Sequence, residues 1–126
     1  LENLPDAKKY YLRVKTLDEY SYANEIRPDF IKCDVEGAEL LVFQGAKNTL
    51  LNNKPIVFSE ILRKWSRKFN YNPNEIFKFF NDLGYRSYTA GNFKLKKFYN
   101  MNDNTKETNF FFLHRIKHKK LIETYT

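Results

Sequence analysis

The segment between residues 29 and 61 constrains the fold more than any other part of the sequence. Residues 29–35 (DFIKCDV) follow a proline and lead to Gly37, which is typical of a short strand. Residues 38–53 carry apolar side chains at helical spacing and predict an amphipathic helix. Residues 55–61 (PIVFSEI) are too short for a helix and predict a strand buried on both faces. Together they predict a βαβ unit with two parallel strands.

A second helix is signalled by Asn72 as a cap, Pro73 at the first position and Glu75 three residues after the cap, and it is expected to stop at Gly84. Its expected inner face consists of Ile76, Phe79, Phe80 and Leu83. Three further strands are expected at residues 85–90, 94–99 and 109–116. The last is the most apolar, so we expect it to lie centrally, between and antiparallel to the strands at 55–61 and 85–90.

The remaining segments are less regular. Residues 10–16 predict a strand exposed on one face, and residues 17–26 a short helix capped at Asp18. We expect loops at 63–71 and 100–109. The fold class is therefore α/β, as part of a doubly wound, Rossmann-like sheet that ends in an antiparallel hairpin.

Length, cysteine content and charge exclude several classes. A chain of 126 residues is one small domain, and we expect a folded unit over residues 1–116 followed by a loosely held basic tail at 117–126. One cysteine excludes a disulfide framework and a multi-cysteine zinc site, and favours a cytoplasmic location. No apolar run is long enough to predict a membrane span.

Residues 1–62 carry eight Lys and Arg against ten Asp and Glu, whereas residues 63–126 carry fourteen against five. Such a basic half can serve an acidic partner, a phosphate-rich membrane face or nucleic acid. We interpret it as solvated lysine and expect no nucleic-acid partner.

Acidic residues gather where the two parallel strands are expected to end. Asp34, Glu36 and Glu39 follow the first strand, and Glu60 ends the second. Carboxylates in this crevice can act as a general base, position a hydroxyl group or hold a divalent cation. Because acidic residues also stabilise a first helical turn, we favour a structural role for Glu39 and a functional one for Asp34.

The other candidates carry weaker signals. His114 lies in an apolar strand, where a hydrogen-bonded core role is expected, and Cys33 is expected to be buried and inert. Trp65 lies among basic residues, as in proteins that bind single-stranded nucleic acid, but a surface or gating loop is the favoured interpretation.

Three ordered segments carry a family resemblance: TLDEY at residues 16–20, KCDVEGAE at 32–39 with Gly45 and Ala46 beyond it, and PIVFSE at 55–60. They resemble the C-terminal half of the FkbM-like methyltransferases, which use S-adenosylmethionine to methylate hydroxyl groups. The resemblance implies that the strands of this chain correspond to the fourth to seventh strands of the methyltransferase sheet, whose order is 3-2-1-4-5-7-6. It also implies a small hydroxylated acceptor such as a sugar.

The resemblance implies roles for individual residues. Asp34, Glu36 and Glu60 are the expected catalytic residues, and Asp34, Val35 and Gly37 the expected cofactor contacts, with Val35 turned back into the core and Gly37 allowing close approach of the ligand. No metal is expected.

The family's glycine-rich loop, which holds most of the cofactor, has no counterpart here, so the chain alone is not expected to bind S-adenosylmethionine. The strand at 29–35 is left with a bare edge, which favours a homodimer. The alternative function is a non-catalytic binding or assembly module with a basic surface.

Overall fold

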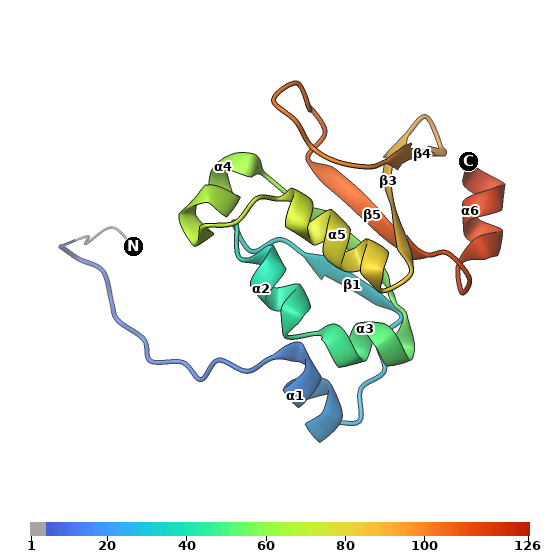
Figure 1. Ribbon diagram of the computed structural model, residues 1–126. Coiled ribbons are helices and arrows are strands. Elements are labelled where there is room, and N and C mark those ends of the chain that lie inside the picture. The colour runs from blue at the N-terminus through green and yellow to red at the C-terminus, as the bar shows by residue number, and fades with distance from the viewer. Residues whose placement is uncertain (1–4) are drawn as a thin grey trace.

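The computed structural model describes residues 5–126 and contains one five-stranded mixed sheet (Figure 1). Its order is β1-β2-β5-β3-β4. The strands are β1 (Phe30–Cys33), β2 (Ile56–Glu60), β3 (Tyr85–Gly91), β4 (Lys94–Phe98) and β5 (Asn109–His114). β1 and β2 are parallel, and the other neighbouring pairs are antiparallel. The predicted βαβ unit and the central, antiparallel position of the last strand are confirmed.

Short helices connect these strands. They are α1 (Leu17–Ala23), α2 (Glu39–Gln44), α3 (Lys47–Asn53), α4 (Arg63–Ser66), the 3₁₀ helix η1 (Arg67–Phe69), α5 (Asn74–Asp82) and α6 (Lys119–Tyr125). None of those within residues 5–126 has the length and apolar character needed to span a membrane.

The single helix expected at residues 38–53 is wrong, because α2 ends at Gln44 and α3 begins at Lys47. Asp18 accounts for the break. Its backbone N–H donates to the carbonyl of Gly45 (2.9 Å), and its carboxylate accepts from the backbone N–H groups of Asn48 (3.0 Å) and Thr49 (2.8 Å) in the first turn of α3. Asp18 therefore caps α3, whereas α1, which it was expected to cap, is capped by Thr16.

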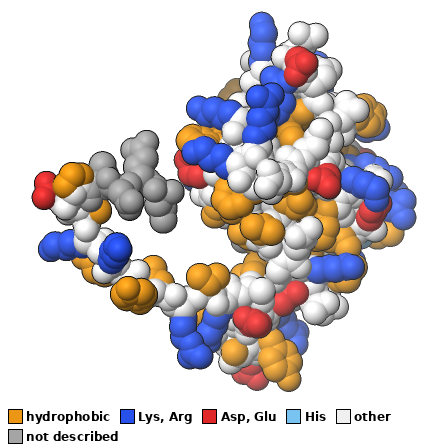
Figure 2. All heavy atoms as spheres, turned by 60° about the vertical axis from the view of Figure 1, so that its left-hand side comes forward, with side chains coloured by type: hydrophobic (Ala, Val, Ile, Leu, Met, Phe, Trp, Pro, Cys, Tyr) orange, Lys and Arg blue, Asp and Glu red, His pale blue; other side chains and the backbone are white. Residues whose placement is uncertain are grey.

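Three other expectations are also wrong. Residues 10–16 form no strand but an exposed arm that stands away from the body, with Tyr11 97% and Val14 94% exposed (Figure 2). The expected loop at 63–71 contains α4 and η1. The expected tail contains α6, whose Leu121 and Tyr125 line an apolar hollow together with Phe111 and Leu113 of β5, on one face of the sheet.

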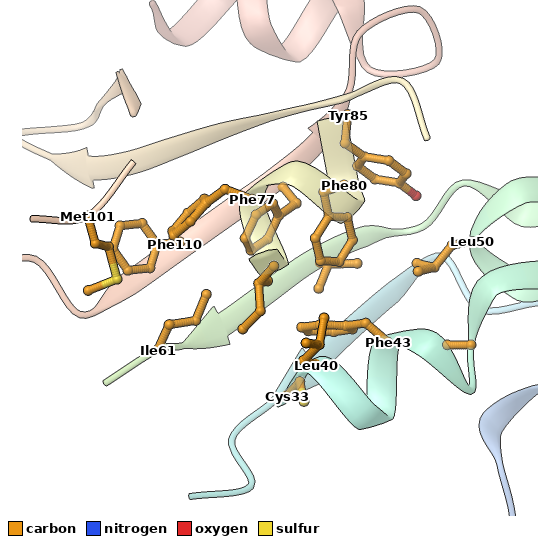
Figure 3. Close-up of a cluster of buried hydrophobic side chains, with 14 residues drawn as sticks. Cys33, Leu40, Phe43, Leu50, Ile61, Phe77, Phe80, Tyr85, Met101 and Phe110 are labelled. Carbon is orange, nitrogen blue, oxygen red and sulfur yellow. The ribbon is translucent and has the colours of Figure 1, made fainter. Parts of the chain in front are cut away.

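The core lies on the opposite face, between the sheet and helices α2 and α5 (Figure 3). Phe80 of α5 stacks on Phe112 of β5 with ring centroids 4.1 Å apart, and Phe43 of α2 meets the Phe80 ring edge-on at 4.8 Å. Burying one such side chain contributes about 1.5–3 kcal/mol. The predicted inner face of α5 is rotated slightly: Phe77 is buried and Phe79 only partly, because Phe77 lies against Phe110 of β5.

Candidate functional site

The parallel strands β1 and β2 place Asp34 and Glu60 together at the carboxyl ends of the two strands, and this end of the sheet is called the acidic edge below. Cys33 is in register with Ser59, so the two acidic residues follow matched positions and lie on the face away from the buried Cys33 and Ser59 side chains. The pKa of Glu60 is raised by desolvation and then by the nearby charges of Asp34, Glu36 and Glu39. The register places Asp34 and Glu60 side by side, and Glu36 follows two residues after Asp34 in the same loop; these three residues are called the acidic group below.

The loop that carries Asp34 is held by a buried glutamate. The Glu39 carboxylate, only 3% exposed, accepts a hydrogen bond from the backbone N–H of Val35 (3.0 Å). This contact agrees with a structural role for Glu39. It leaves Asp34 and Glu36 exposed at the sheet edge. The Val35 side chain is 40% exposed, so the expectation that it turns back into the core is wrong.

Gly37 is required by its backbone conformation and by a close neighbour. Its φ is +107°, and a Cβ built there would lie 2.5 Å from the carbonyl oxygen of Trp65. The Tyr71 hydroxyl donates to the carbonyl of Gly37 (2.7 Å). The surface beside Gly37 is thus covered by the backbone of α4, where the sequence predicted a close approach of ligand.

A polar pocket of about 820 Å³ lies between the α4–η1 segment and the loop that joins β4 to β5. It is lined by Arg63, Arg67, Asn70, Tyr71, Asn72, Pro73, Glu75, Met101, Asn102 and Asp103. Sequence reasoning missed this site because its walls are thirty residues apart and were each expected to be loops. The available signal was the pair of arginines in a segment without acidic residues.

The remaining candidates have structural contacts. Nδ1 of His114 accepts from the backbone N–H groups of Ile116 (3.3 Å) and Lys117 (3.2 Å), which confirms the expected hydrogen-bonded core role. Cys33 is buried, and desolvation followed by the charges of Glu39 and Asp34 raises its thiol pKa to about 12, so it is unreactive.

The side-chain ammonium groups of two lysines lie over the ring of Trp65. Nζ of Lys68 lies 4.2 Å and that of Lys64 4.9 Å from the ring centroid.

Across residues 5–126, no group of three His, Cys, Asp or Glu side chains has an arrangement that could hold a metal ion.

Comparison with known proteins gives one match. The family model described as the methyltransferase FkbM domain matches residues 4–87, from before α1 to within β3. No curated protein and no solved structure matches the chain. The matched segment includes the whole acidic edge formed by Asp34, Glu36 and Glu60. The chain therefore belongs to the FkbM methyltransferase domain family.

Proposed function

We propose that this chain supplies the substrate-side half of an S-adenosylmethionine-dependent O-methyltransferase acting on a small hydroxylated acceptor such as a sugar. Family membership supports methyl transfer. The neighbouring strands β1-β2-β5-β3 support the correspondence with the fourth, fifth, seventh and sixth strands of the methyltransferase sheet. Ligands of open α/β sheets bind beyond the carboxyl ends of the parallel strands, which here is the edge that carries Asp34 and Glu60.

The observation that carries the proposal is the acidic group at this edge. An attacking hydroxyl must be oriented and must lose its proton, and a carboxylate with a raised pKa holds a proton better than an ordinary one. The pKa of Glu60 is raised in this way, by desolvation and then by its acidic neighbours. We assign Asp34 to the position nearest the reacting oxygen, Glu60 to the orientation of the acceptor hydroxyl, and Glu36 to the wall of the crevice.

S-adenosylmethionine supplies the methyl group in this family. The residues present fit only the acceptor side of such a reaction. Within residues 5–126 no glycine-rich turn links a strand to a helix, and the backbone of Trp65 covers the position of Gly37. Asp34 and Val35 remain exposed to a ligand at the edge. The other cofactor contacts would come from residues outside this chain.

The test is methyl transfer by the protein that contains this chain, with saturating cofactor and a panel of hydroxylated acceptors. Asp34→Asn is expected to lower kcat by about 10²-fold or more, because it removes a group that acts on the reacting proton. The control is Asp29→Asn, which changes an exposed carboxylate just before the other end of β1. Turnover by Asp34→Asn at the rate of the control would remove Asp34 from the mechanism.

A second candidate is a non-catalytic assembly module. It is favoured by the exposed apolar arm at residues 10–14 and by the open edge of β1, where Phe30 is 54% exposed. Unpaired strand edges bind other strands readily. If this reading holds, the chain associates with a second copy and transfers no methyl group.

A further inference from the structure

We propose that the polar pocket between α4–η1 and the β4–β5 loop binds the acceptor, and that this acceptor carries an anionic group, a carboxylate or a phosphate, beside its hydroxyl groups. The identification of the ligand as the methyl acceptor rests on the proposed function. The pocket itself is argued from its position, its hydrogen-bond donors and its charge.

The pocket opens at the same edge of the sheet as the acidic group. Its first wall follows β2 directly, and its second wall leads into β5, whose first residue, Asn109, is in register with Glu60. The backbone N–H of Ile61 donates to the carbonyl of Thr108 (2.7 Å), which ties the bases of the two walls together. Tyr71 lines the pocket and also donates to the carbonyl of Gly37. A ligand in the pocket therefore lies beside the loop that carries Asp34.

The pocket is held in shape by its floor. Met101 is buried, and its backbone N–H donates to the Asn74 amide oxygen (2.7 Å), while the Asn74 amide donates to the Met101 carbonyl (2.9 Å). These paired bonds fix the β4–β5 loop against α5. The volume of about 820 Å³ lies within the range of about 300–1,000 Å³ that small-molecule sites occupy.

Amide groups supply the donors for hydroxyl recognition. Asn70, Asn72 and Asn102 all line the pocket. Among the described residues, the Nδ2 groups of these three side chains have no hydrogen-bond partner. Each can donate two hydrogen bonds, and Tyr71 adds an aromatic surface beside them. This combination suits a polyhydroxylated molecule.

The two arginines of the pocket differ in whether an acidic side chain neutralises them. Arg63 is paired with Asp103, with Nη1 to Oδ1 at 3.1 Å. Glu75 accepts from the backbone N–H of Asn72 (3.1 Å). Within residues 5–126, Arg67 has no ion pair or hydrogen bond from its guanidinium. Residues 61–74 include four Lys and Arg and no Asp or Glu, and Lys and Arg side chains gather on the upper part of the body in Figure 2.

A planar guanidinium without a protein partner is suited to a carboxylate or phosphate, which it can bind through two parallel hydrogen bonds. An anionic group at Arg67 would place the rest of the acceptor among the asparagines, with its hydroxyl groups toward the loop of Asp34.

The test titrates the 126-residue chain with four ligands at constant ionic strength: glucose, glucuronate, glucose 6-phosphate and inorganic phosphate. We expect at least one acidic sugar to bind ten times or more tighter than glucose, and the two acidic sugars separate a carboxylate from a phosphate. Equal affinity for glucose and both acidic sugars would overturn the proposal. Phosphate binding as tightly as glucose 6-phosphate would overturn the sugar component.

Arg67→Gln is expected to weaken binding of the preferred acidic sugar by tenfold or more and to leave glucose binding unchanged. Lys96→Gln, an equal loss of charge at an exposed position of β4, is the matched control. Both positions are exposed, and circular dichroism checks that both variants fold. An equal effect of the two variants would show general charge attraction and would overturn the assignment to Arg67.

These binding measurements need neither cofactor nor turnover, so the two proposals can fail separately. Acidic-sugar binding that depends on Arg67, in a protein that methylates none of these ligands, would remove the proposed function and retain the site. Methylation of neutral and acidic sugars with equal efficiency, unaffected by Arg67→Gln, would retain the proposed function and overturn the inference.

Discussion

The Asp18 carboxylate accepts three hydrogen bonds from α3: two from backbone N–H groups and one from the Thr49 hydroxyl (2.7 Å). Asp18→Ala is expected to lower the free energy of unfolding by about 1–2 kcal/mol, because it removes a helix cap. Asp18→Asn keeps one acceptor oxygen and should cost less. Urea unfolding measures both, with Asp29→Ala as a control at an exposed acid. Equal stability of Asp18→Ala and the control would show that the cap is dispensable.

The Asp18 carboxylate is also expected to make the stability of the fold sensitive to acid. Burial alone would raise its pKa, but the hydrogen bonds from Thr49 and Asn48 lower it below the usual 3.8. Because the folded-state pKa is the lower one, the stabilisation is complete above pH 3.8 and is lost as the pH falls through the folded value. In Asp18→Asn this part of the acid denaturation curve should disappear.

Gly37 and Gly91 form a matched pair for testing the loop below α4. Gly37→Ala places a Cβ at positive φ and 2.5 Å from the Trp65 carbonyl oxygen, so we expect a loss of about 1–3 kcal/mol or more. Gly91→Ala meets no atom within 4 Å and should change stability by less than about 1 kcal/mol. Thermal or urea unfolding compares the two variants, and equal losses would contradict the role assigned to the Trp65 contact.

The candidate site was only partly predictable from single residues. Asp34 and Glu60 were placed correctly at one edge, because parallel strands must end together and the sequence shows where each strand stops. The pocket around Arg67 and Asn102 was not, because it depends on how two irregular segments pack, and irregular segments have no periodicity to reveal their inner faces.

At the scale of elements, apolar periodicity predicted the five strands of the sheet and α5 well, but it wrongly added a strand at residues 10–16 and placed the helix ends poorly. Apolar positions run through residues 38–53 without interruption, so the pattern does not show the break at Gly45. The break is caused by a distant segment: a Cβ at Gly45 would lie 3.1 Å from Thr16, and Asp18 caps the helix that follows. Sequence windows do not detect such tertiary contacts.

The turn between β5 and α6 depends on two neutral imidazoles. Nδ1 of His118 accepts a hydrogen bond from the backbone N–H of His114 (2.8 Å). Nδ1 of His114 in turn accepts one from the backbone N–H of Ile116. The pKa of each is lowered, first by burial and then by nearby cations, chiefly Lys54 for His114 and Lys117 for His118. The unfolded chain therefore binds more protons below the usual pKa of 6.5.

We expect the melting temperature to be steady above about pH 6.5 and to fall as the pH drops through the lower folded-state values. His118→Asn retains an acceptor near the position of Nδ1 but does not titrate, so its melting temperature should fall less between pH 7.5 and 5.0. Thermal melts at both pH values, for wild type and variant, measure the difference. Parallel curves would mean that His118 does not contribute to the acid sensitivity.

At the scale of the whole molecule, the sheet has two free edges of different character. The β4 edge carries Lys94, Lys96 and Lys97, and lysines on an edge strand discourage pairing with another chain. The β1 edge has the sequence FIKC and begins with the half-exposed Phe30. An apolar hollow of about 330 Å³ reaches from Phe30 and Ile56 to Lys94 and Leu95 of β4, so it does not distinguish the two edges. Self-association is therefore favoured at β1.

The resulting prediction is that the chain forms a dimer through β1, with a mass in light scattering of twice 15.2 kDa at high micromolar concentration. Phe30→Lys puts a charge on this edge and should shift the mass to that of the monomer. Tyr99→Lys is the control, because Tyr99 is 76% exposed and follows β4, the strand at the other edge of the sheet. A wild-type monomer at every concentration, or equal dissociation by the control, would refute pairing at β1 and remove one of the two observations that favour the assembly function.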